Sequence, residues 1–457
     1  MENINKKITS ERTTLFVALA FLILVTSFNP FEKTLVSRLL SLMIIAVGIL
    51  PYIVWRNDPN RQQILPGIIW YGIFYIICFG LTGFVEHNIR TGAYQDYSNT
   101  SEYISKILTI MHLCIVFSVF YTLNKLFKKK IEVEKTKSLP IENDNQFYFI
   151  IFLCFVITAI RIADNEIGGV VIGMMGTLSF MYLFYYIFIE NKGNFFLAVI
   201  ACVGYLETAG GFQGNIKPFV DLGFLIFFIN LQKGRILILP ALFMVLTILI
   251  YQPMKGYVRP LMTEIGVSSA ESFSIGIETL EGKGLIDLVD IATSRLDHGA
   301  LLSAFVEHID SSDYIKWKAY ENLPYAPIPR FLWPGKPEEG FGNEWAVQEG
   351  WLNRDDYITS YNLPWLPQMY LSYGPFGVII GSLLIGIILY LLNRFYWTAP
   401  SRPWDHSMGL VALLMMFSLD SDFTITFGIL VKFIIIDICV RLLRNTLEIQ
   451  RDKSNSY

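Results

Sequence analysis

Apolar residues occur along this chain in long runs that are separated by polar segments. The runs lie at roughly 13–29, 34–55, 64–84, 103–126, 146–162, 168–190, 194–209, 215–231, 235–252, 366–393, 407–420 and 423–443. Helices of about 17–25 apolar residues are long enough to cross the hydrocarbon core of a bilayer. The pattern therefore predicts an all-α polytopic integral membrane protein with about 12 transmembrane helices. The first run lacks a small-residue cleavage site, so we expect it to remain as the first helix.

The composition agrees with a membrane protein. Hydrophobic residues make up 53% of the chain and charged residues 16%, whereas soluble proteins carry about 25% charged residues. All the cysteines lie in apolar runs. This excludes a disulfide framework in the long polar segment between the runs 235–252 and 366–393, and the spacing of the cysteines matches no zinc site. They are Cys78, Cys114, Cys154, Cys202 and Cys439.

Basic residues are distributed unevenly between alternate connections. One set of connections, which includes both termini, carries 20 Lys and Arg residues, and the other set of short connections with its helix ends carries 6. Because basic residues accumulate on the cytoplasmic side of membranes, both termini are predicted to be cytoplasmic. We expect a multi-pass protein of the bacterial inner membrane.

The segment 253–364 then becomes a large periplasmic loop. It divides the chain into an N-terminal bundle of about nine helices at 1–252, the loop, and about three helices with a cytoplasmic tail at 365–457. Aromatic residues occur throughout the loop, which argues against disorder. Its apolar spacing from Leu285 to Ile309 predicts an amphipathic helix, and the loop is therefore expected to be partly helical.

Cations are scarce in this loop, which has 17 acidic and 9 basic residues. Two groups of residues stand out. One is Arg295-Leu296-Asp297-His298-Gly299, on the predicted helix, and the other is Pro329-Arg330-Phe331-Leu332-Trp333-Pro334-Gly335-Lys336-Pro337. Prolines restrict the second backbone, and guanidinium groups suit phosphate oxygens, so this group suits a diphosphate next to a sugar. The alternative is that Arg330 and Trp333 anchor the loop at the lipid headgroups.

His298 follows Arg295 by three positions, so both are expected on one face of the predicted helix. A neutral imidazole there could accept a proton from a hydroxyl, and a protonated one could hold phosphate. The alternative is a surface histidine paired with Asp297 or Asp290.

Ionisable residues inside the predicted spans need a wet cavity or a partner. Arg161 and Lys217 approach the outer level of the loop, which favours a functional role. For Lys432 we prefer a structural pair with a carboxylate of a neighbouring helix. For the turn Asp420-Ser421-Asp422 a helix-capping role is preferred over a divalent cation site.

The stretch from Pro329 to Pro337 resembles a motif of Wzy-type O-antigen and exopolysaccharide repeat-unit polymerases. In that family a Gly- and Asn-containing sequence and a Tyr-Gly-Gly-like turn follow, and here Gly340-Phe341-Gly342-Asn343 and Tyr370-Leu371-Ser372-Tyr373-Gly374-Pro375-Phe376-Gly377 follow. The motif covers about 50 residues, and the topology covers nearly the whole chain. Many members carry an Arg before the helix corresponding to 215–231. This chain has Lys217 there.

The resemblance implies a GT-C-like membrane glycosyltransferase. It would transfer a glycan from its undecaprenyl diphosphate carrier to a second carrier-linked repeat unit, and Arg330 and Arg295 would hold the donor diphosphate. We predict catalytic roles for Arg295, Asp297, His298 and Arg330. Substrate-binding roles are predicted for Arg161, Lys217, Arg259, Trp333, Lys336, Glu344 and Tyr373. The general base is left open among Asp297, Glu307 and Glu344.

Partners and alternatives follow from the same reading. We expect lipid-linked donor and acceptor glycans as substrates and allow a chain-length regulator protein as a partner. No cofactor, metal or nucleic acid is expected. An O-antigen ligase with the same donor and a lipid-linked oligosaccharide flippase are the alternatives, and a large one-sided loop favours an enzyme over a flippase.

Overall fold

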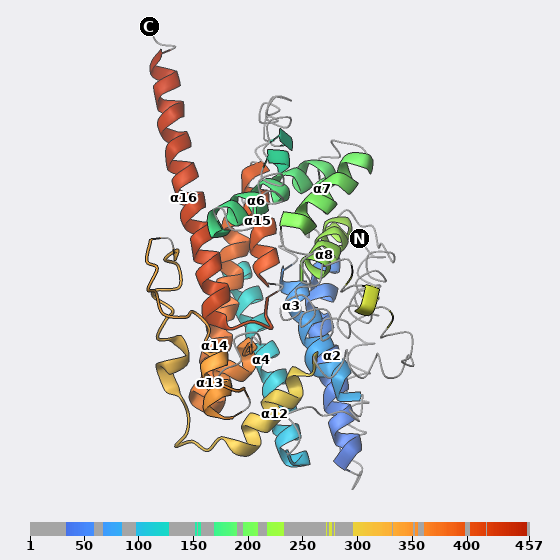
Figure 1. Ribbon diagram of the computed structural model, residues 1–457. Coiled ribbons are helices and arrows are strands. Elements are labelled where there is room, and N and C mark those ends of the chain that lie inside the picture. Colours follow the sequence, from blue (N-terminus) through green and yellow to red (C-terminus); the bar gives the residue numbers. More distant parts are fainter. Residues whose placement is uncertain are drawn as a thin grey trace, which may run out of the picture.

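The computed structural model contains only helices among the residues that it describes. These are residues 33–58, 67–84, 97–127, 151–152, 154–156, 169–189, 195–208, 217–232, 271, 274–276, 278, 296–330, 332–350, 352–354, 361–397, 403–416 and 418–454. Four helices contain a stretch long and apolar enough to cross a membrane: α2 (Lys33–Asn57), α4 (Asn99–Leu126), α14 (Trp365–Tyr396) and α16 (Phe423–Ser454). The chain is therefore a helical membrane protein (Figure 1).

Shorter apolar helices complete the described bundle. They are α3 (Gly67–Tyr75) continued by η2 (Ile76–Leu81) and η3 (Thr82–Phe84), α6 (Gly169–Phe184) continued by η4 (Tyr185–Ile189), α7 (Phe195–Thr208), α8 (Lys217–Gln232) and α15 (Pro403–Met416). Each predicted span that falls on described residues is thus helical. The predicted spans 13–29 and 235–252, and nearly all of 146–162, lie outside those residues.

Helix α4 is central to the described bundle. It packs against α2, α14 and α12 (His298–His308). Inside it, His112 is fully buried, and its Nε2 lies 2.6 Å from the hydroxyl of Tyr71 on α3 while its Nδ1 lies 2.7 Å from Ser382 on α14. Away from water such hydrogen bonds satisfy groups that would otherwise be costly to bury. A second polar contact, from Lys106 to Glu102 and Ser37, links α4 to α2.

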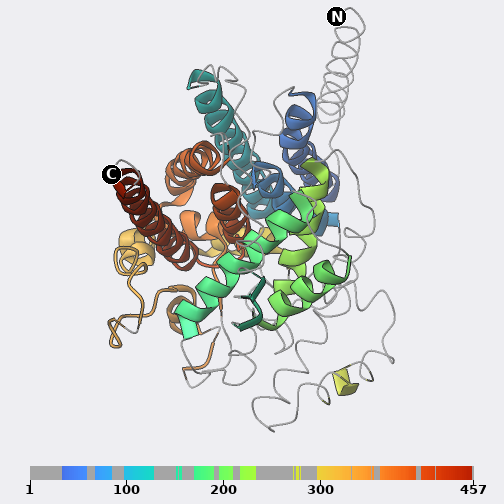
Figure 2. The same ribbon diagram turned by 90° about the horizontal axis from the view of Figure 1, so that it is seen from above.

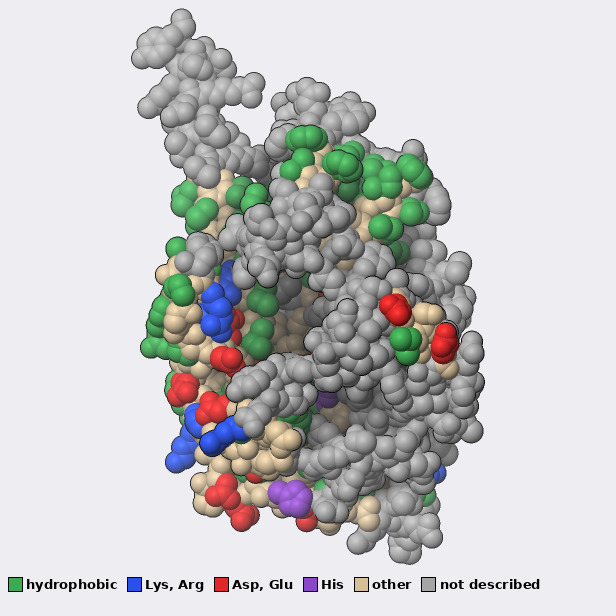
Figure 3. Space-filling view, viewed as in Figure 1, with side chains coloured by type: hydrophobic (Ala, Val, Ile, Leu, Met, Phe, Trp, Pro, Cys, Tyr) green, Lys and Arg blue, Asp and Glu red, His purple; other side chains and the backbone are tan. Residues whose placement is uncertain are grey.

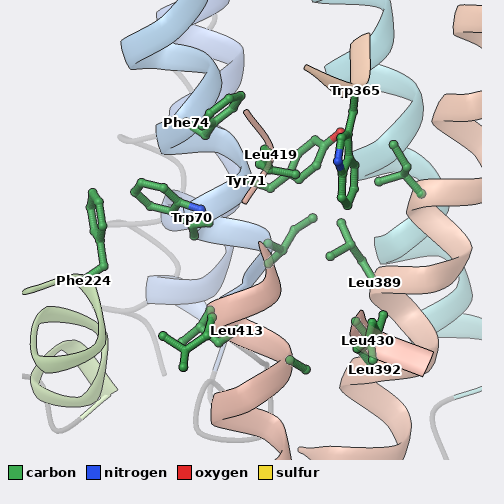
Figure 4. Packing of buried hydrophobic residues seen from close by; sticks show 14 of the residues in the cluster. Trp70, Tyr71, Phe74, Phe224, Trp365, Leu389, Leu392, Leu413, Leu419 and Leu430 are labelled. Atoms are coloured by element: carbon green, nitrogen blue, oxygen red, sulfur yellow. The ribbon is translucent and has the colours of Figure 1, made fainter. Parts of the chain in front are cut away.

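Aromatic side chains fill the space around α3. Trp70 faces Phe224 of α8 with ring centroids 3.7 Å apart, and Tyr71 points toward Trp365 at the start of α14 (Figure 4). Both Trp70 and Tyr71 are almost fully buried. This core joins helices from the two ends of the sequence.

Helix α14, which contains the predicted span 366–393, is sharply bent rather than straight. Tyr373 and Gly374 have non-helical backbone angles, and Gly374 has a φ of 59°, which a side chain would oppose. Pro375 follows and has no N–H to continue the helix. A Cβ on Gly377 would overlap the carbonyl of Met369, although residues eight apart in a straight helix are about 12 Å apart. The first segment of α14 therefore folds back against the second.

The end of the bundle that carries the C-terminus, called here the tail end, is held by one ionic network. Arg441 of α16 donates from Nε to both oxygens of Asp437, at 2.9 Å each, and its Nη2 pairs with Asp405 of α15. Tyr396 of α14 and Trp404 of α15 donate to the same Asp437, at 3.1 and 2.7 Å. Three helices are therefore fixed to one another here.

The opposite end, called here the loop end, carries α12, η6 (Lys316–Tyr320) and α13 (Gly342–Gln348) (Figure 1). Of the predicted helix over 285–309, the structure describes residues 296–309. Asp297 has non-helical angles and caps α12, which begins at His298. The described backbone is therefore not continuously helical through Asp297. Arg295 lies outside the described residues, so its expected place on the same helix face as His298 stays a prediction.

Candidate functional site

The first turn of α12 places His298 against the transmembrane core. The side chain of Asp297 accepts a hydrogen bond from the backbone N–H of Ala300 at 3.0 Å, which fixes the start of the helix. The imidazole of His298 then lies beside the rings of Phe74 and Phe79, with centroids 5.8 and 6.2 Å away. Figure 1 shows α12 lying across α4 at the loop end.

The Nε2 atom of His298 is buried and has no hydrogen-bond partner among the described residues. Burial lowers the pKa of His298, because the charged imidazolium would lose its hydration, and this outweighs the opposite effects of Asp420 and Asp297. The imidazole is therefore neutral at pH 7, and its buried Nε2 leaves one hydrogen bond unfilled among the described residues. This matches the chemistry of a proton acceptor better than that of a phosphate-binding cation.

Asp420 also acts electrostatically on His298. The sequence analysis considered this residue only as part of a helix-capping turn or a cation site. It lies in the turn between α15 and α16, yet its charge acts on both His298 and Cys78. Sequence proximity gave no sign of this, because the contact joins positions more than 100 residues apart. A carboxylate in a short turn between two apolar spans was the available signal.

The three carboxylates left open as general base have structural partners. Asp297 caps α12. Glu307 accepts hydrogen bonds from the backbone and hydroxyl of Ser98 and from the hydroxyl of Ser101, and these lower its pKa to about 2. Glu344 forms an exposed ion pair with Lys318 at 2.8 Å.

The proline-rich turn Pro329–Pro337 is built around Lys336. Its ammonium donates to the carbonyls of Ala326 and Ile328, at 3.3 and 2.7 Å, and pairs with Glu339. These contacts use all three donors of a lysine, and the side chain is only 1% exposed. Lys336 therefore holds the turn from inside, and the structure does not place it where a ligand could reach its charge.

Arg330 has the opposite environment. It is exposed, and its Nη1 donates to the carbonyl of Lys336 at 3.1 Å. No carboxylate of the described residues pairs with it, so the rest of its guanidinium remains open. Trp333 is 38% exposed and packs edge-on against Tyr325, with centroids 5.5 Å apart. The turn thus exposes a guanidinium and part of an indole, whereas Lys336, which was expected beside them, is buried.

Lys432 of α16 joins this turn. Its Nζ lies 3.5 Å from Glu339, and both Lys336 and Arg330 act on it electrostatically. The expected structural pair is therefore present, but its carboxylate belongs to the loop rather than to a neighbouring helix.

Asp422 binds the loop at a second point. This buried carboxylate accepts backbone N–H groups of Gly342, at 3.0 Å, and Leu363, at 2.6 Å. Burial raises its pKa to about 6, despite these hydrogen bonds. The capping role expected for the turn 420–422 is correct in kind, but Asp422 caps the start of α13 rather than its own helix.

The structure describes only some of the remaining residues that were predicted to belong to the site. Tyr373 is 41% exposed and lies at the bend of α14. Lys217 begins α8, and Arg161, Arg259 and Arg295 lie outside the described residues. His298 and Arg330 belong to different surroundings: α12 packs on α4 and η2, whereas the turn packs on α16.

Metal binding has no support in the part of the chain that the structure describes. There, no group of three or more His, Cys, Asp or Glu side chains could hold an ion.

Comparisons with known proteins identify a family for the chain but no activity. No curated protein and no solved structure matches the chain. A family model described as a domain of unknown function, DUF8712, matches residues 68–395, which include α3, α4, α12, the proline-rich turn and nearly all of α14. The chain therefore belongs to the DUF8712 family.

Proposed function

We propose that this protein polymerises undecaprenyl-diphosphate-linked oligosaccharide repeat units of an O-antigen or exopolysaccharide. In this proposal the chain is a GT-C-like inner-membrane glycosyltransferase with twelve spans. Both termini are cytoplasmic and the loop 253–364 is periplasmic. The uneven distribution of basic residues supports this orientation.

The observation that carries the proposal is the open guanidinium of Arg330. The turn that presents it is fixed by prolines and by the saturated ammonium of Lys336. A guanidinium can form two parallel hydrogen bonds to phosphate oxygens, and the nearby indole of Trp333 offers a face for a sugar. Such a preorganised cation stabilises a diphosphate leaving group as its charge develops.

The proposed reaction joins two lipid-linked substrates. A hydroxyl of the acceptor sugar attacks the anomeric carbon of the donor glycan, and the bond from that carbon to the diphosphate oxygen breaks. Undecaprenyl diphosphate leaves with the electron pair, and the hydroxyl proton passes to a base. Nε2 of His298 is proposed as the base, because it is neutral and has no described partner while Asp297, Glu307 and Glu344 have other partners. This proposal requires α12 and the proline-rich turn to come together around the substrates, since their described contacts lie on different helices. Arg295 precedes His298 closely in the chain and is proposed as a second ligand of the diphosphate.

A deletion strain tests this function directly. Without a polymerase, surface lipid should carry a single repeat unit, because the ligase still attaches it. Loss of a flippase would leave no repeat at the surface, and loss of a ligase would leave polymer on its carrier. Either of the last two patterns would overturn the proposal, and restoration of the long glycans by the plasmid-borne gene is the control.

A further inference from the structure

The turn 418–422, which follows α15 and leads into α16, lies inside the helix bundle. Helix α15 packs against α3, α6, α8, α14 and α16. Seen from above, it lies between α16 and α3 (Figure 2). The carbonyl of Leu419 accepts the backbone N–H of Trp365 at 3.3 Å, which joins the turn to the start of α14. The turn is therefore fixed among helices and not at an outer surface.

Asp420 is exposed although its neighbours in this turn are buried. Leu419 and Asp422 are each 1% exposed and Ser418 is 8% exposed, whereas Asp420 is open to solvent. No hydrogen bond or ion pair joins its side chain to another residue that the structure describes. A carboxylate among membrane helices needs a wet cavity or a partner. Asp420 therefore faces a hollow, and Figure 3 shows one near the middle of the molecule.

His298 lies near the same turn. Figure 4 shows Leu419 close to Phe74 of α3, and the ring of Phe74 lies 5.8 Å from the imidazole of His298. Of the charged groups that act on this imidazole, Asp420 has the largest effect. The imidazole and the carboxylate are therefore neighbours, although they belong to the loop and to the last pair of helices.

The other titratable groups near the imidazole have other partners or no charge to offer. Asp297 accepts the backbone N–H at the start of α12. Cys78 of η2 is a buried free thiol. Lys106 of α4 is held in an ion pair with Glu102 at 2.7 Å. Asp420 is thus the acid that is free to act as a counter-charge.

We propose that Asp420 is a positioning residue that acts through His298, by stabilising the imidazolium that forms when Nε2 takes the proton of the acceptor hydroxyl. The O–H bond breaks as the oxygen bonds to the anomeric carbon, the proton goes to Nε2, and Asp420 stays ionised throughout. An ordinary carboxylate is a weaker base than an imidazole, which suits Asp420 to this supporting role. The inference rests on the proposed function, because that function makes His298 the base.

Chemical modification of His298 tests the pair without relying on any activity. Diethyl pyrocarbonate reacts with neutral imidazoles, and mass spectrometry of the purified full chain in phosphatidylcholine nanodiscs identifies the modified histidine. The rate plotted against pH gives the midpoint of protonation of His298. Because a nearby carboxylate favours the charged imidazole, Asp420→Asn should lower this midpoint by at least about 0.5 pH unit, or about threefold in proton affinity.

Two further variants serve as controls for this shift. Asp420→Glu keeps the charge and should keep the midpoint close to that of the wild type. Asp310→Asn removes an exposed carboxylate elsewhere in the loop and should leave the midpoint unchanged. An unchanged midpoint in Asp420→Asn would overturn the pair, and no reaction at His298 in the wild type would overturn the hollow beside it.

The rate of polymerisation by the purified protein gives a second measurement. Asp420→Asn should lower kcat at pH 7 at least about tenfold with little change in KM, and the decline of activity on the acid side should move to lower pH. A slower rate without that movement would make Asp420 merely structural and overturn the proposal. A deletion phenotype other than single repeats would reject the polymerase but leave the shift in modification in place. An unchanged midpoint would reject the pair and leave the polymerase in place.

Discussion

Two basic residues of the same turn, six positions apart, have different environments. The ammonium of Lys336 is enclosed and fully hydrogen bonded, whereas the guanidinium of Arg330 is exposed and mostly open. The ammonium of Lys336 donates inward to the carbonyls of Ala326 and Ile328, whereas Arg330 donates to the carbonyl of Lys336. Only the outer residue is available for a substrate.

Replacement of Arg330 by lysine should slow polymerisation about tenfold. Lysine keeps the charge but loses one of two parallel hydrogen bonds to phosphate, which corresponds to about 1.4 kcal/mol of transition-state stabilisation. Arg330→Ala should abolish polymerisation without removing the protein from the membrane. The measurement is glycan chain length in expression-matched strains. Wild-type length with lysine and mild impairment with alanine would make Arg330 a headgroup anchor, because lysine reaches the membrane surface as well as arginine does.

Replacement of His298 by glutamine should abolish polymerisation and leave the amount of membrane-inserted protein unchanged. Glutamine is similar in size and polar, but it does not accept a proton at neutral pH. Because burial lowers the pKa of His298, activity should persist as the pH falls through 6.5 and decline only below that value. A half-maximal rate at or above pH 6.5 in a purified assay would contradict a buried neutral base.

At the scale of single residues, the sequence could not predict the direction in which each side chain points. The sequence indicated a site at Arg330 and Trp333, and the side chains of both are exposed. It did not reveal that Lys336 points inward or that Lys432 pairs with Glu339, because these outcomes depend on how the loop packs along α16. The spacing of residues within one segment does not predict how that segment packs against a distant helix.

At the scale of elements, Asp422 connects α16 to the segments on both sides of α13. It receives N–H groups from Gly342 and Leu363 while lying 1% exposed. Helix positions were predictable from apolar runs, since a hydrocarbon environment permits few other backbone structures. The ends and bends were less predictable: α12 starts at His298 because Asp297 caps it, and α14 folds back at Gly374.

Asp422→Asn should destabilise the protein by about 1–3 kcal/mol, because the amide replaces one acceptor oxygen by a donor that faces backbone N–H groups. Thermal unfolding in detergent measures this effect, with the exposed Asp310→Asn as the matched control.

The pH dependence of this stability has a defined sign. The pKa of Asp422 is raised from 3.8 to about 6 in the folded state. At pH values between these two, the folded protein therefore binds more protons than the unfolded chain does. The contribution of Asp422 should be full below about pH 4 and lost as the pH rises through 6. The slope in this window should be missing from Asp422→Asn and present in Asp310→Asn. An unchanged slope in Asp422→Asn would assign the titration to another group.

At the scale of the whole molecule, the two ends of the bundle differ in what holds them. The tail end has the Asp405, Asp437 and Arg441 network, which fixes three helices. The loop end has α12 attached to α4 through Glu307 and α13 attached to α16 through Asp422. A membrane protein of apolar helices was predictable from hydropathy alone. The pairing of distant helices, such as α4 with α14, was not, since many arrangements bury the same apolar surface.

Labelling with an impermeant maleimide tests the orientation that the proposal assumes. A cysteine at Ser311 should react when the reagent is added outside, and a cysteine at Ser401 should react only after the membrane is opened. The native cysteines lie in apolar segments, and a variant with all of them replaced is the background. The reverse labelling pattern would place the loop in the cytoplasm and remove it from any periplasmic substrate.

The bend of α14 has a consequence for how the chain is assembled. As synthesis proceeds, an insertion machinery meets 32 residues of strongly apolar sequence, about 48 Å if straight, which exceeds the bilayer core of about 30 Å by more than half. The packing of Met369 against Gly377 can form only after Gly374 has turned the chain back, and Gly377 lies C-terminal to that turn. The fold-back therefore requires sequence on both sides of Gly374, and it sets the position of the end of the loop, which leads into the first segment of α14. Variants that stiffen Gly374 should accumulate as inserted but incompletely folded protein.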